Sequence, residues 1–360
     1  MLDRIKNGTA FLVFAVLLWL AWFVWPGPVR AADTPLMPVD YETSTLGVDY
    51  STMQEWVAAK VAAVDMVTAQ KGQVLILPTG TYADWCEIPQ SATTNSDYFI
   101  VIKAADGATV TIAPTLEAHI GNYINTYHYT FAIWADYTKI ISINVDWSGV
   151  NTVNPTYSHT PFLGHSTAAY TRLINCTAKN VNPSGGAGYP MLFFNQPGTG
   201  LINCAVSGSP YGFLFGSGTS ECFTYNCTFR GPGIGYYNSG AVAISKNCLN
   251  SESGTWTGDW TKTTCLDATP TWLTGTEFDL DPGDTTALGQ GTDLTADGTF
   301  AFSYDRNNDT RPTLWSVGAD DAAAEEPEPE PETPAVRYKP WALGPWGAGP
   351  WNGAGTGGWK

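Results

Sequence analysis

Ile-Asn-Cys-Thr-Ala at residues 174–178 is one of five related segments that recur along the middle of the chain. The others are Ile-Asn-Val-Asp-Trp at 143–147, Ile-Asn-Cys-Ala-Val at 202–206, Tyr-Asn-Cys-Thr-Phe at 225–229 and Lys-Asn-Cys-Leu-Asn at 246–250. Their first asparagines are separated by 31, 28, 23 and 21 residues. A repeat of about 20–30 residues indicates a solenoid, in which each unit stacks on the one before it.

Within these segments, apolar and polar residues alternate after the asparagine. Cys176 and Ala178 are small and apolar, whereas Thr177 and Lys179 are polar, which is typical of a strand with one buried face. Asparagine tolerates the left-handed backbone of a tight turn, and its amide can bond to the same turn in neighbouring units. The sequence therefore predicts an asparagine ladder at one corner of a parallel β-helix, formed by Asn144, Asn175, Asn203, Asn226 and Asn247.

Segments at both ends of the repeats resemble right-handed parallel β-helix proteins of the pectin-lyase-like superfamily. Residues 49–56 resemble the amphipathic segment that caps such helices, and residues 74–82 resemble the first strand with its Pro-x-Gly-x-Tyr turn. Residues 305–320 resemble the closing segment of secreted or phage-encoded members. The resemblance covers residues 45–321 and implies an all-β fold. Because the superfamily contains lyases, hydrolases, adhesins and phage tailspikes, the fold alone assigns no activity.

The N-terminal residues 1–31 form a targeting segment. Arg4 and Lys6 precede an uncharged apolar run, and Val29-Arg30-Ala31 offers the small residues that a signal peptidase reads. The segment is a signal peptide cleaved after Ala31 or, as the alternative, an uncleaved signal anchor. Either one places the rest of the chain outside the cytoplasm, and only the anchor would hold it to a membrane.

The rest of the chain divides into four segments. Residues 32–72 contain a lead-in and a cap helix, and residues 73–250 form the coils. Residues 251–321 are expected to form closing coils and a cap, which a solenoid needs to shield its last rung. Residues 322–360 combine a Pro/Glu linker with a Gly/Pro/Trp tail, a composition that buries no core and predicts disorder.

The acidic net charge of the chain limits the kinds of ligand that it can bind. The formal net charge is −16, and no basic stripe is present, so the chain lacks the features of a nucleic-acid-binding protein. The same charge opposes electrostatic capture of an acidic polysaccharide unless a cation such as calcium bridges the two.

Four of the seven cysteines, Cys176, Cys204, Cys227 and Cys248, occupy the same place in successive repeats. We expect them to point inward as a stack of reduced thiols, because small apolar side chains fill the narrow core of such a helix. Disulfides between rungs about 4.8 Å apart are the alternative. Cys222 and Cys265 are expected nearer to turns.

Enzymes of the resembled superfamily work on the outer face of the first strand of each coil. Counting back eight residues from the first four ladder asparagines gives Asp136, Thr167, Asn195 and Gly218, and His165 lies two residues before Thr167. The expected groove therefore contains Asp136, His165 and Asn195, with Trp134 and Phe194 nearby. Asp136 and His165 are the candidates for acid–base catalysis, and Trp134, Phe194 and Asn195 are the candidates for substrate binding. The paired aspartates of the hydrolases and the calcium-binding carboxylates of the lyases are not visible. The alternatives are a turn role for Asp136 and an ordinary exposed position for His165.

A weak calcium-like spacing occurs near the end of the expected coils. Asp305, Asn307 and Asp309 match the first half of a calcium loop, but Thr310 replaces the glycine and Ser316 replaces the bidentate glutamate. A closing turn is the simpler interpretation, so the sequence assigns no cofactor, and calcium is the cation to expect if one is bound.

Two classes of function fit these observations. The first is an exported β-helix protein, adhesin-like or tailspike-like and thus secreted or virion-associated, that binds extracellular or cell-surface polysaccharide through aromatic and polar side chains. The alternative is a polysaccharide lyase or glycoside hydrolase of the pectin-lyase-like superfamily. Because no complete catalytic motif is present, the sequence leaves enzymatic activity undecided. A tailspike-like role would imply a homo-oligomer, although the chain has no coiled-coil heptads.

Overall fold

The structure is a computed structural model in which most of the chain between residues 36 and 319 is described. The described residues are 36–115, 121–123, 127–150, 158–165, 168–181, 188–194, 196–240, 242–274, 276–307, 310–312 and 314–319. The predicted export segment, the linker and tail, Asn195 and Asp309 lie outside them. None of the helices in this described part is long and apolar enough to span a membrane.

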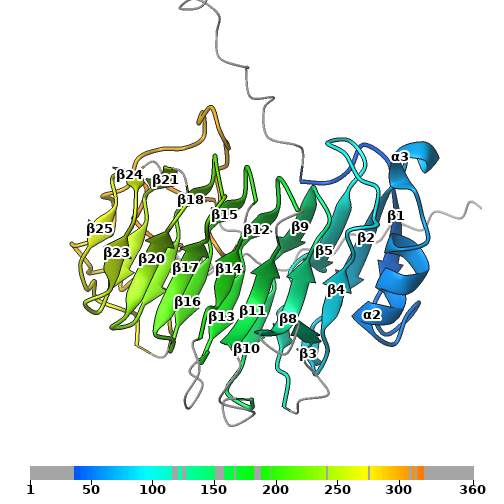
Figure 1. The fold of residues 1–360 in the computed structure, drawn as a ribbon. Helices are drawn as coiled ribbons and strands as arrows, with labels where there is room; N and C mark the ends of the chain where they lie inside the picture. Colours follow the sequence, from blue (N-terminus) through cyan, green and yellow to red (C-terminus); the bar gives the residue numbers. More distant parts are fainter. Residues whose placement is uncertain are drawn as a thin grey trace, which may run out of the picture. The chain divides into compact units, whose positions relative to one another are not determined.

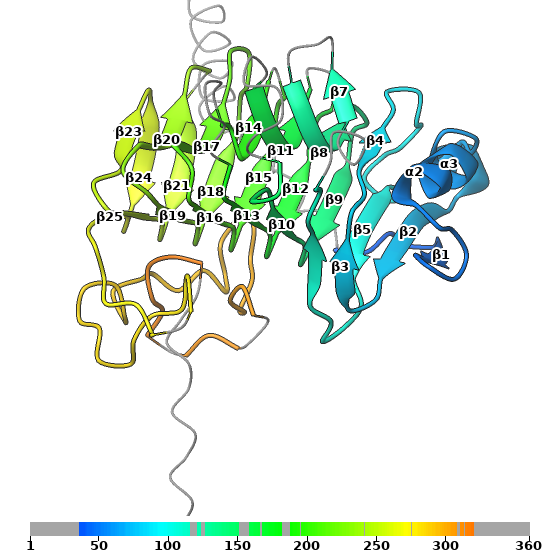
Figure 2. The same ribbon diagram turned by 90° about the horizontal axis from the view of Figure 1, so that it is seen from below.

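The chain winds through three sheets in turn, adding one strand to each sheet per coil (Figures 1 and 2). The first sheet contains β1 (Tyr41–Thr45), β2 (Gly72–Leu77), β5 (Ile100–Ala104), β9 (Thr138–Ile141), β12 (Arg172–Ile174), β15 (Gly200–Ile202), β18 (Phe223–Tyr225), β21 (Ala243–Lys246) and β24 (Trp260–Thr263). The second sheet contains β3 (Gly80–Tyr82), β6 (Val110–Ile112), β10 (Asn144–Asp146), β13 (Thr177–Lys179), β16 (Ala205–Ser207), β19 (Thr228–Arg230), β22 (Leu249–Ser251) and β25 (Leu266–Asp267).

The third sheet contains β4 (Cys86–Ile88), β8 (Tyr127–Ile133), β11 (Ser158–Gly164), β14 (Met191–Phe193), β17 (Tyr211–Phe215), β20 (Ile234–Asn238) and β23 (Thr255–Thr257). Strands in successive coils pair in parallel, and β7 (Gly121–Tyr123), which pairs with β8, is antiparallel. Parallel strands of one sheet are joined by right-handed crossovers. The predicted all-β, right-handed parallel β-helix is confirmed.

The N-terminal end is capped by short helices between β1 and β2. These are α2 (Met53–Trp56), a π-helical turn η1 (Val57–Val61) and α3 (Met66–Ala69). A capping box starts α2, because the side chain of Thr52 accepts from the backbone N–H of Glu55 and the Glu55 side chain accepts from the backbone of Thr52. Met53, Trp56, Val57, Val61 and Met66 are buried against the first coil. The cap is thus present, but it is interrupted before α3 and is not one continuous helix.

Four of the five predicted ladder asparagines lie at the corner between the first and second sheets. Asn175, Asn203, Asn226 and Asn247 have φ values of 56°, 51°, 51° and 52°, in the left-handed region. Two of these amides contact each other directly, because Nδ2 of Asn203 donates to Oδ1 of Asn175 at 3.1 Å. The same corner is occupied by Ser142 in the preceding coil and by Thr264 in the last, with φ values of 58° and 52°.

The prediction that Asn144 belongs to this ladder is wrong. Asn144 is the first residue of β10 and pairs with Thr177, two residues beyond the corner. Ile143 and Val145 point into the core together with Cys176 and Ala178. Because side chains in a strand repeat every two residues, a shift of two preserves the alternation, and the sequence pattern alone does not separate the two registers.

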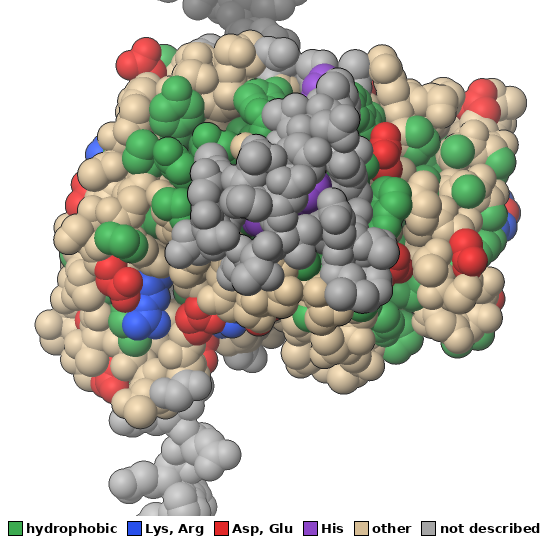
Figure 3. All heavy atoms as spheres, turned by 60° about the horizontal axis from the view of Figure 1, so that its bottom comes forward, with side chains coloured by type: hydrophobic (Ala, Val, Ile, Leu, Met, Phe, Trp, Pro, Cys, Tyr) green, Lys and Arg blue, Asp and Glu red, His purple; other side chains and the backbone are tan. Residues whose placement is uncertain are grey.

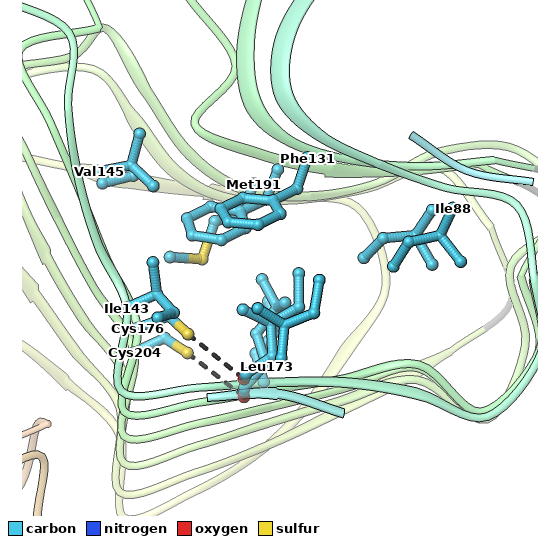
Figure 4. Close-up of a cluster of buried hydrophobic side chains, with 14 of the residues drawn as sticks. Ile88, Phe131, Ile143, Val145, Leu173, Cys176, Met191 and Cys204 are labelled. Atoms are coloured by element: carbon cyan, nitrogen blue, oxygen red, sulfur yellow. Dashed lines mark hydrogen bonds between the residues drawn. The ribbon is translucent and has the colours of Figure 1, made fainter. Parts of the chain in front are cut away.

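The cysteine stack lies inside this corner (Figure 4). Cys176, Cys204, Cys227 and Cys248 are buried, and all are free thiols, as predicted. Each donates to a backbone carbonyl of the preceding coil; for example, Cys176 Sγ donates to Ile140 O and Cys204 Sγ to Leu173 O, both at 3.4 Å. Burial raises the pKa of the Cys176 thiol well above its usual value. Cys265, expected nearer to a turn, follows the corner residue Thr264 and continues the column.

The segment after β25 folds back along the side of the coils. Its apolar side chains pack on outward-facing residues of the first sheet, with Leu294, Phe300, Phe302 and Trp315 against Ile174, Ile202, Phe223 and Tyr225. Figure 2 shows this yellow-to-orange segment beside the second-sheet strands β13, β16 and β19. We call the described residues from 276 to 319 the strap. The sequence suggested that this part would shield the last rung, whereas the strap covers the ladder corner of several coils.

Candidate binding face on the third sheet

The outer face of the third sheet carries a continuous aliphatic row. Ala132, Leu163, Leu192 and Leu214 are register partners on β8, β11, β14 and β17, and Tyr237 on β20 extends the row. The four aliphatic side chains are at most 5% exposed, although they point away from the core of the helix. A sheet face of this kind provides an apolar floor on the outside of the solenoid.

Aromatic rings stand around this floor. Tyr127, Tyr189, Phe194, Tyr211 and Tyr237 are half-buried and line a groove of about 420 Å³ together with Leu192 and Leu214. The ring centroids of Tyr189 and Tyr211 are 4.8 Å apart, and those of Tyr127 and Phe194 are 6.0 Å apart. Figure 3 shows hydrophobic side chains gathered on this side of the molecule. Four of the five rings end in a hydroxyl, so the groove combines apolar surface with polar tips.

A glycine shapes the groove beside Phe194. A Cβ atom at Gly216 would lie 2.3 Å from Cδ1 of Phe194, closer than two carbon atoms can approach. Gly216 therefore allows the ring to lie over the end of β17. The side chain of any other residue would have to displace the ring.

Three of the predicted site residues, Trp134, His165 and Phe194, lie at the ends of third-sheet strands beside the groove. The ring centroids of Trp134 and His165 lie 4.1 Å apart, and His165 is flanked by Phe194 in the next coil. Burial lowers the pKa of His165 below its ordinary value of 6.5, so its imidazole is neutral at pH 7. The structure thus brings Trp134, His165 and Phe194 together, whereas Asn195 lies outside the described residues.

Asp136 has a different setting. Its Oδ1 accepts the backbone N–H of Ala169 in the next coil, and its main-chain carbonyl accepts from Oγ1 of Thr94 at 2.9 Å. The carboxylate therefore links the backbones of two coils. Asp136 thus bonds to the backbone in a turn, which is the alternative to a catalytic role that its sequence context offered.

The same face also carries a carboxylate that was not predicted from the sequence, that of Glu87. Glu87 on β4 accepts a hydrogen bond from the hydroxyl of Tyr129 at 2.7 Å, and the Trp85 ring meets Tyr129 edge-on at 5.9 Å. Burial and the Glu87 carboxylate raise the pKa of the Tyr129 hydroxyl. Counting back from the ladder asparagines does not reach Trp85 and Glu87, because the coil that contains β4 has no such asparagine. The recurrence of tyrosine at or near the start of third-sheet strands was the available signal.

The weak calcium candidate forms a turn in the strap. Oδ1 of Asp305 accepts the backbone N–H of Asn307 at 2.9 Å, and Asp305 is buried. Asp309 is outside the described residues, so the full set of three is not described. Within the described part of the chain, no group of three or more His, Cys, Asp or Glu side chains has a metal-binding arrangement.

The three-sheet topology defines a right-handed parallel β-helix, with an aromatic groove on the outside of its third sheet. Two kinds of solved structure are similar to it. A pectin methylesterase from Aspergillus niger is 14% identical over 64% of this chain and 86% of its own, with a TM-score of 0.32. Pectate lyase Pel9A is 13% identical over 80% of this chain and 96% of its own, also with a TM-score of 0.32. At these values the likeness carries no argument about this chain, whose fold rests on its own sheet topology. No protein-family model and no curated protein matches the chain.

Proposed function

We propose that this protein binds a polysaccharide along the outer face of its third sheet. The observation that carries the proposal is the groove bounded by Tyr127, Tyr189, Phe194, Tyr211 and Tyr237 over an aliphatic floor. The C–H faces of a sugar pack on aromatic rings, and tyrosine hydroxyls are partners for sugar hydroxyls. Trp134 and His165 extend the aromatic surface beyond Phe194.

The geometry favours modest affinity. The rings are half-buried, so a bound sugar would lose only part of its hydration. Such a site has a dissociation constant of about millimolar to micromolar. If the chain forms a homo-oligomer, several grooves would act on one polymer and strengthen retention.

The test is a polysaccharide panel probed by affinity gel electrophoresis. The double variant Tyr189→Ala/Tyr211→Ala should lose at least about ten-fold in affinity, equivalent to 1.4 kcal/mol. A matched control is Tyr170→Ala, because Tyr170 also stacks on a tyrosine, Tyr137, at 4.9 Å but lies outside the groove. Binding that survives the double variant would remove the groove from the proposal.

A second double variant, Trp134→Ala/His165→Ala, tests the strand-end residues separately. A loss of affinity here with an intact groove would extend the binding site to these residues. If binding is unchanged, the site ends at Phe194.

Polysaccharide cleavage, by a lyase or a glycoside hydrolase, is the second candidate function. The observation in its favour is His165, whose neutral imidazole lies beside Trp134 on the same face and is suited to accept a proton. Release of unsaturated or reducing sugars, abolished by His165→Ala or Asp136→Asn, would establish an enzyme. Product release that both variants retain would exclude these two residues as catalytic.

Export belongs to the same proposal. A polysaccharide ligand is met outside the cytoplasm, in agreement with the charged and then apolar start of the chain at residues 1–31. Secretion, display on a virion, or retention by an uncleaved anchor would each expose the groove to such a ligand.

A further inference from the structure

We infer that the groove on the third sheet takes an uncharged polysaccharide and discriminates against polyanionic ones. The inference rests on the proposed polysaccharide-binding function and adds the class of ligand. It comes from the distribution of charged side chains over the three sheets.

Lysine and arginine are segregated from the binding face. In the described strands of the third sheet, from β4 to β23, there is no lysine or arginine. The sequence that carries these strands and their flanking turns has none either, over residues 84–99, 113–138, 147–171, 182–199, 208–222, 231–242 and 251–261. A polyanionic chain laid along this face would therefore meet no basic side chain from these segments.

The cations of the coils lie on the other two sheets, where they have structural partners. Lys139 lies 4.6 Å from the centroid of the Phe99 ring, and Arg172 lies 4.9 Å from that of Phe223. On the second sheet, Arg230 pairs with Glu252 at 2.6 Å.

Two further cations pair with acidic residues of the segment that follows the coils. Lys179 pairs with Glu277, and Lys246 pairs with Asp297. These lysines attach the strap to the first and second sheets, on sides of the helix that do not carry the groove.

The charges that do lie on or beside the third-sheet face are negative. Glu87 is bonded to Tyr129 on the face, Asp136 lies at its edge, and His165 is neutral at pH 7. A bound carboxylate or sulfate would lose water without gaining a cationic partner, which is unfavourable. The net charge of −16 adds repulsion at long range. Calcium bridging would need a carboxylate cluster, and the described residues form no group of three potential ligands.

The experiment compares two forms of one polymer, galacturonan with its carboxyl groups methyl-esterified and the same polymer after de-esterification. Their backbones are identical, and they differ in charge and in the ester methyl groups, for which the uncharged glucans, mannans and xylans of the panel are the control. We expect at least about ten-fold tighter binding of the esterified form, or of uncharged glucans, mannans or xylans in the same panel. Affinity for the uncharged polymers should change little between about 20 and 200 mM salt, because no ion pair contributes.

The outcomes separate the two proposals. Equal or tighter binding of the de-esterified polymer, with Tyr189→Ala/Tyr211→Ala still reducing it, would overturn the inference and leave polysaccharide binding in place. Binding of the de-esterified polymer that appears with calcium and disappears with a chelator would overturn it as well. If the protein binds neither the uncharged nor the acidic polymers of the panel, the proposed function itself is overturned.

A charge-insertion variant adds a gain-of-function test. Ser217 is exposed at the rim of the groove, so Ser217→Lys places a cation there without disturbing the core. This variant should bind de-esterified galacturonan several-fold more tightly than the wild type. The control Leu314→Lys makes the same change in net charge at a residue that is 71% exposed on the strap, and it should have no such effect. An equal gain in both variants would show that net charge, and not the face, decides the ligand.

Discussion

The guanidinium Nη2 of Arg311 donates to Oδ1 of Asn203, a ladder residue 108 positions earlier in the chain, at 3.2 Å. The same nitrogen donates to the carbonyls of Gly318 and Ala319, and Nε donates to the carbonyl of Tyr304. Arg311 is 6% exposed, so this buried cation connects two parts of the strap to the corner of the β-helix. The strap is fixed by specific polar contacts as well as by apolar packing.

Arg311→Ala should lower the free energy of unfolding by about 3–5 kcal/mol, because several buried acceptors lose a charged donor at once. Urea denaturation measures the loss, and limited proteolysis should cut the strap before the coils. Arg311→Lys keeps the positive charge but lacks the planar guanidinium group, so its free energy of unfolding should lie between those of the wild type and Arg311→Ala. Wild-type stability in Arg311→Ala would show that the strap is held without the Arg311 contacts, by its apolar side chains and its ion pairs with Lys179 and Lys246.

Cys204→Asp should cost several kcal/mol, because the carboxylate would be buried in the thiol stack without a partner. Cys204→Ala, the matched control, removes only the sulfur and should cost far less. In the native protein, Cys265 should react with a thiol reagent before Cys176, Cys204, Cys227 and Cys248, because it is only partly buried. Rapid native labelling of those four thiols would contradict the buried stack.

His165 should make stability depend on pH. Burial holds the pKa of folded His165 below the ordinary value of 6.5, so the unfolded chain binds a proton more readily than the folded one. Its contribution to stability is present above pH 6.5 and is lost as the pH falls through the folded pKa. Thermal unfolding of the wild type and of His165→Gln between about pH 5 and 8 isolates the contribution of His165 to the pH dependence of stability. Identical pH profiles of the two proteins would show that His165 makes no such contribution.

Gly216→Val should weaken polysaccharide binding without unfolding the coils. The new side chain would occupy the space of the Phe194 ring and force it away from the groove. Binding is measured by affinity electrophoresis and folding by circular dichroism. Gly298→Val is the control, because a Cβ atom added to this strap glycine would meet no other atom within 4 Å.

The mature N-terminus should lie near Ala32 if residues 1–31 are a cleaved signal peptide. N-terminal sequencing of the protein from its native host checks this directly. A chain that begins at Met1 or Leu2 and partitions with membranes would favour the anchor.

Local patterns were sufficient to predict the solenoid, the cap, four corners of the ladder and four cysteines of the stack. They failed at Asn144, because a shift of two residues leaves the strand pattern unchanged. They failed at Cys265, because Thr264 takes the place of the asparagine that marks the other corners. The contact of Arg311 with Asn203 had no local signal at all, since it joins a non-periodic segment to a distant repeat.

The groove was only partly predictable for a related reason. Trp134, His165 and Phe194 were predicted as neighbours of the positions found by counting back eight residues from the first four asparagines, whereas this count does not reach Tyr189, Tyr211 and Tyr237. The turns between the second and third sheets differ in length from coil to coil, so no single offset reaches the start of every third-sheet strand.

The uneven length of the coils has a consequence for assembly of the fold. The corner residues Ser142, Asn175, Asn203, Asn226, Asn247 and Thr264 are separated by 33, 28, 23, 21 and 17 residues. If a strand slipped by one whole coil, it would find a similar Asn-Cys corner, but the loops that follow would be too long or too short to close the next turn. The length of each coil therefore identifies its position in the series. This disfavours pairing between the wrong coils, to which arrays of near-identical repeats are prone.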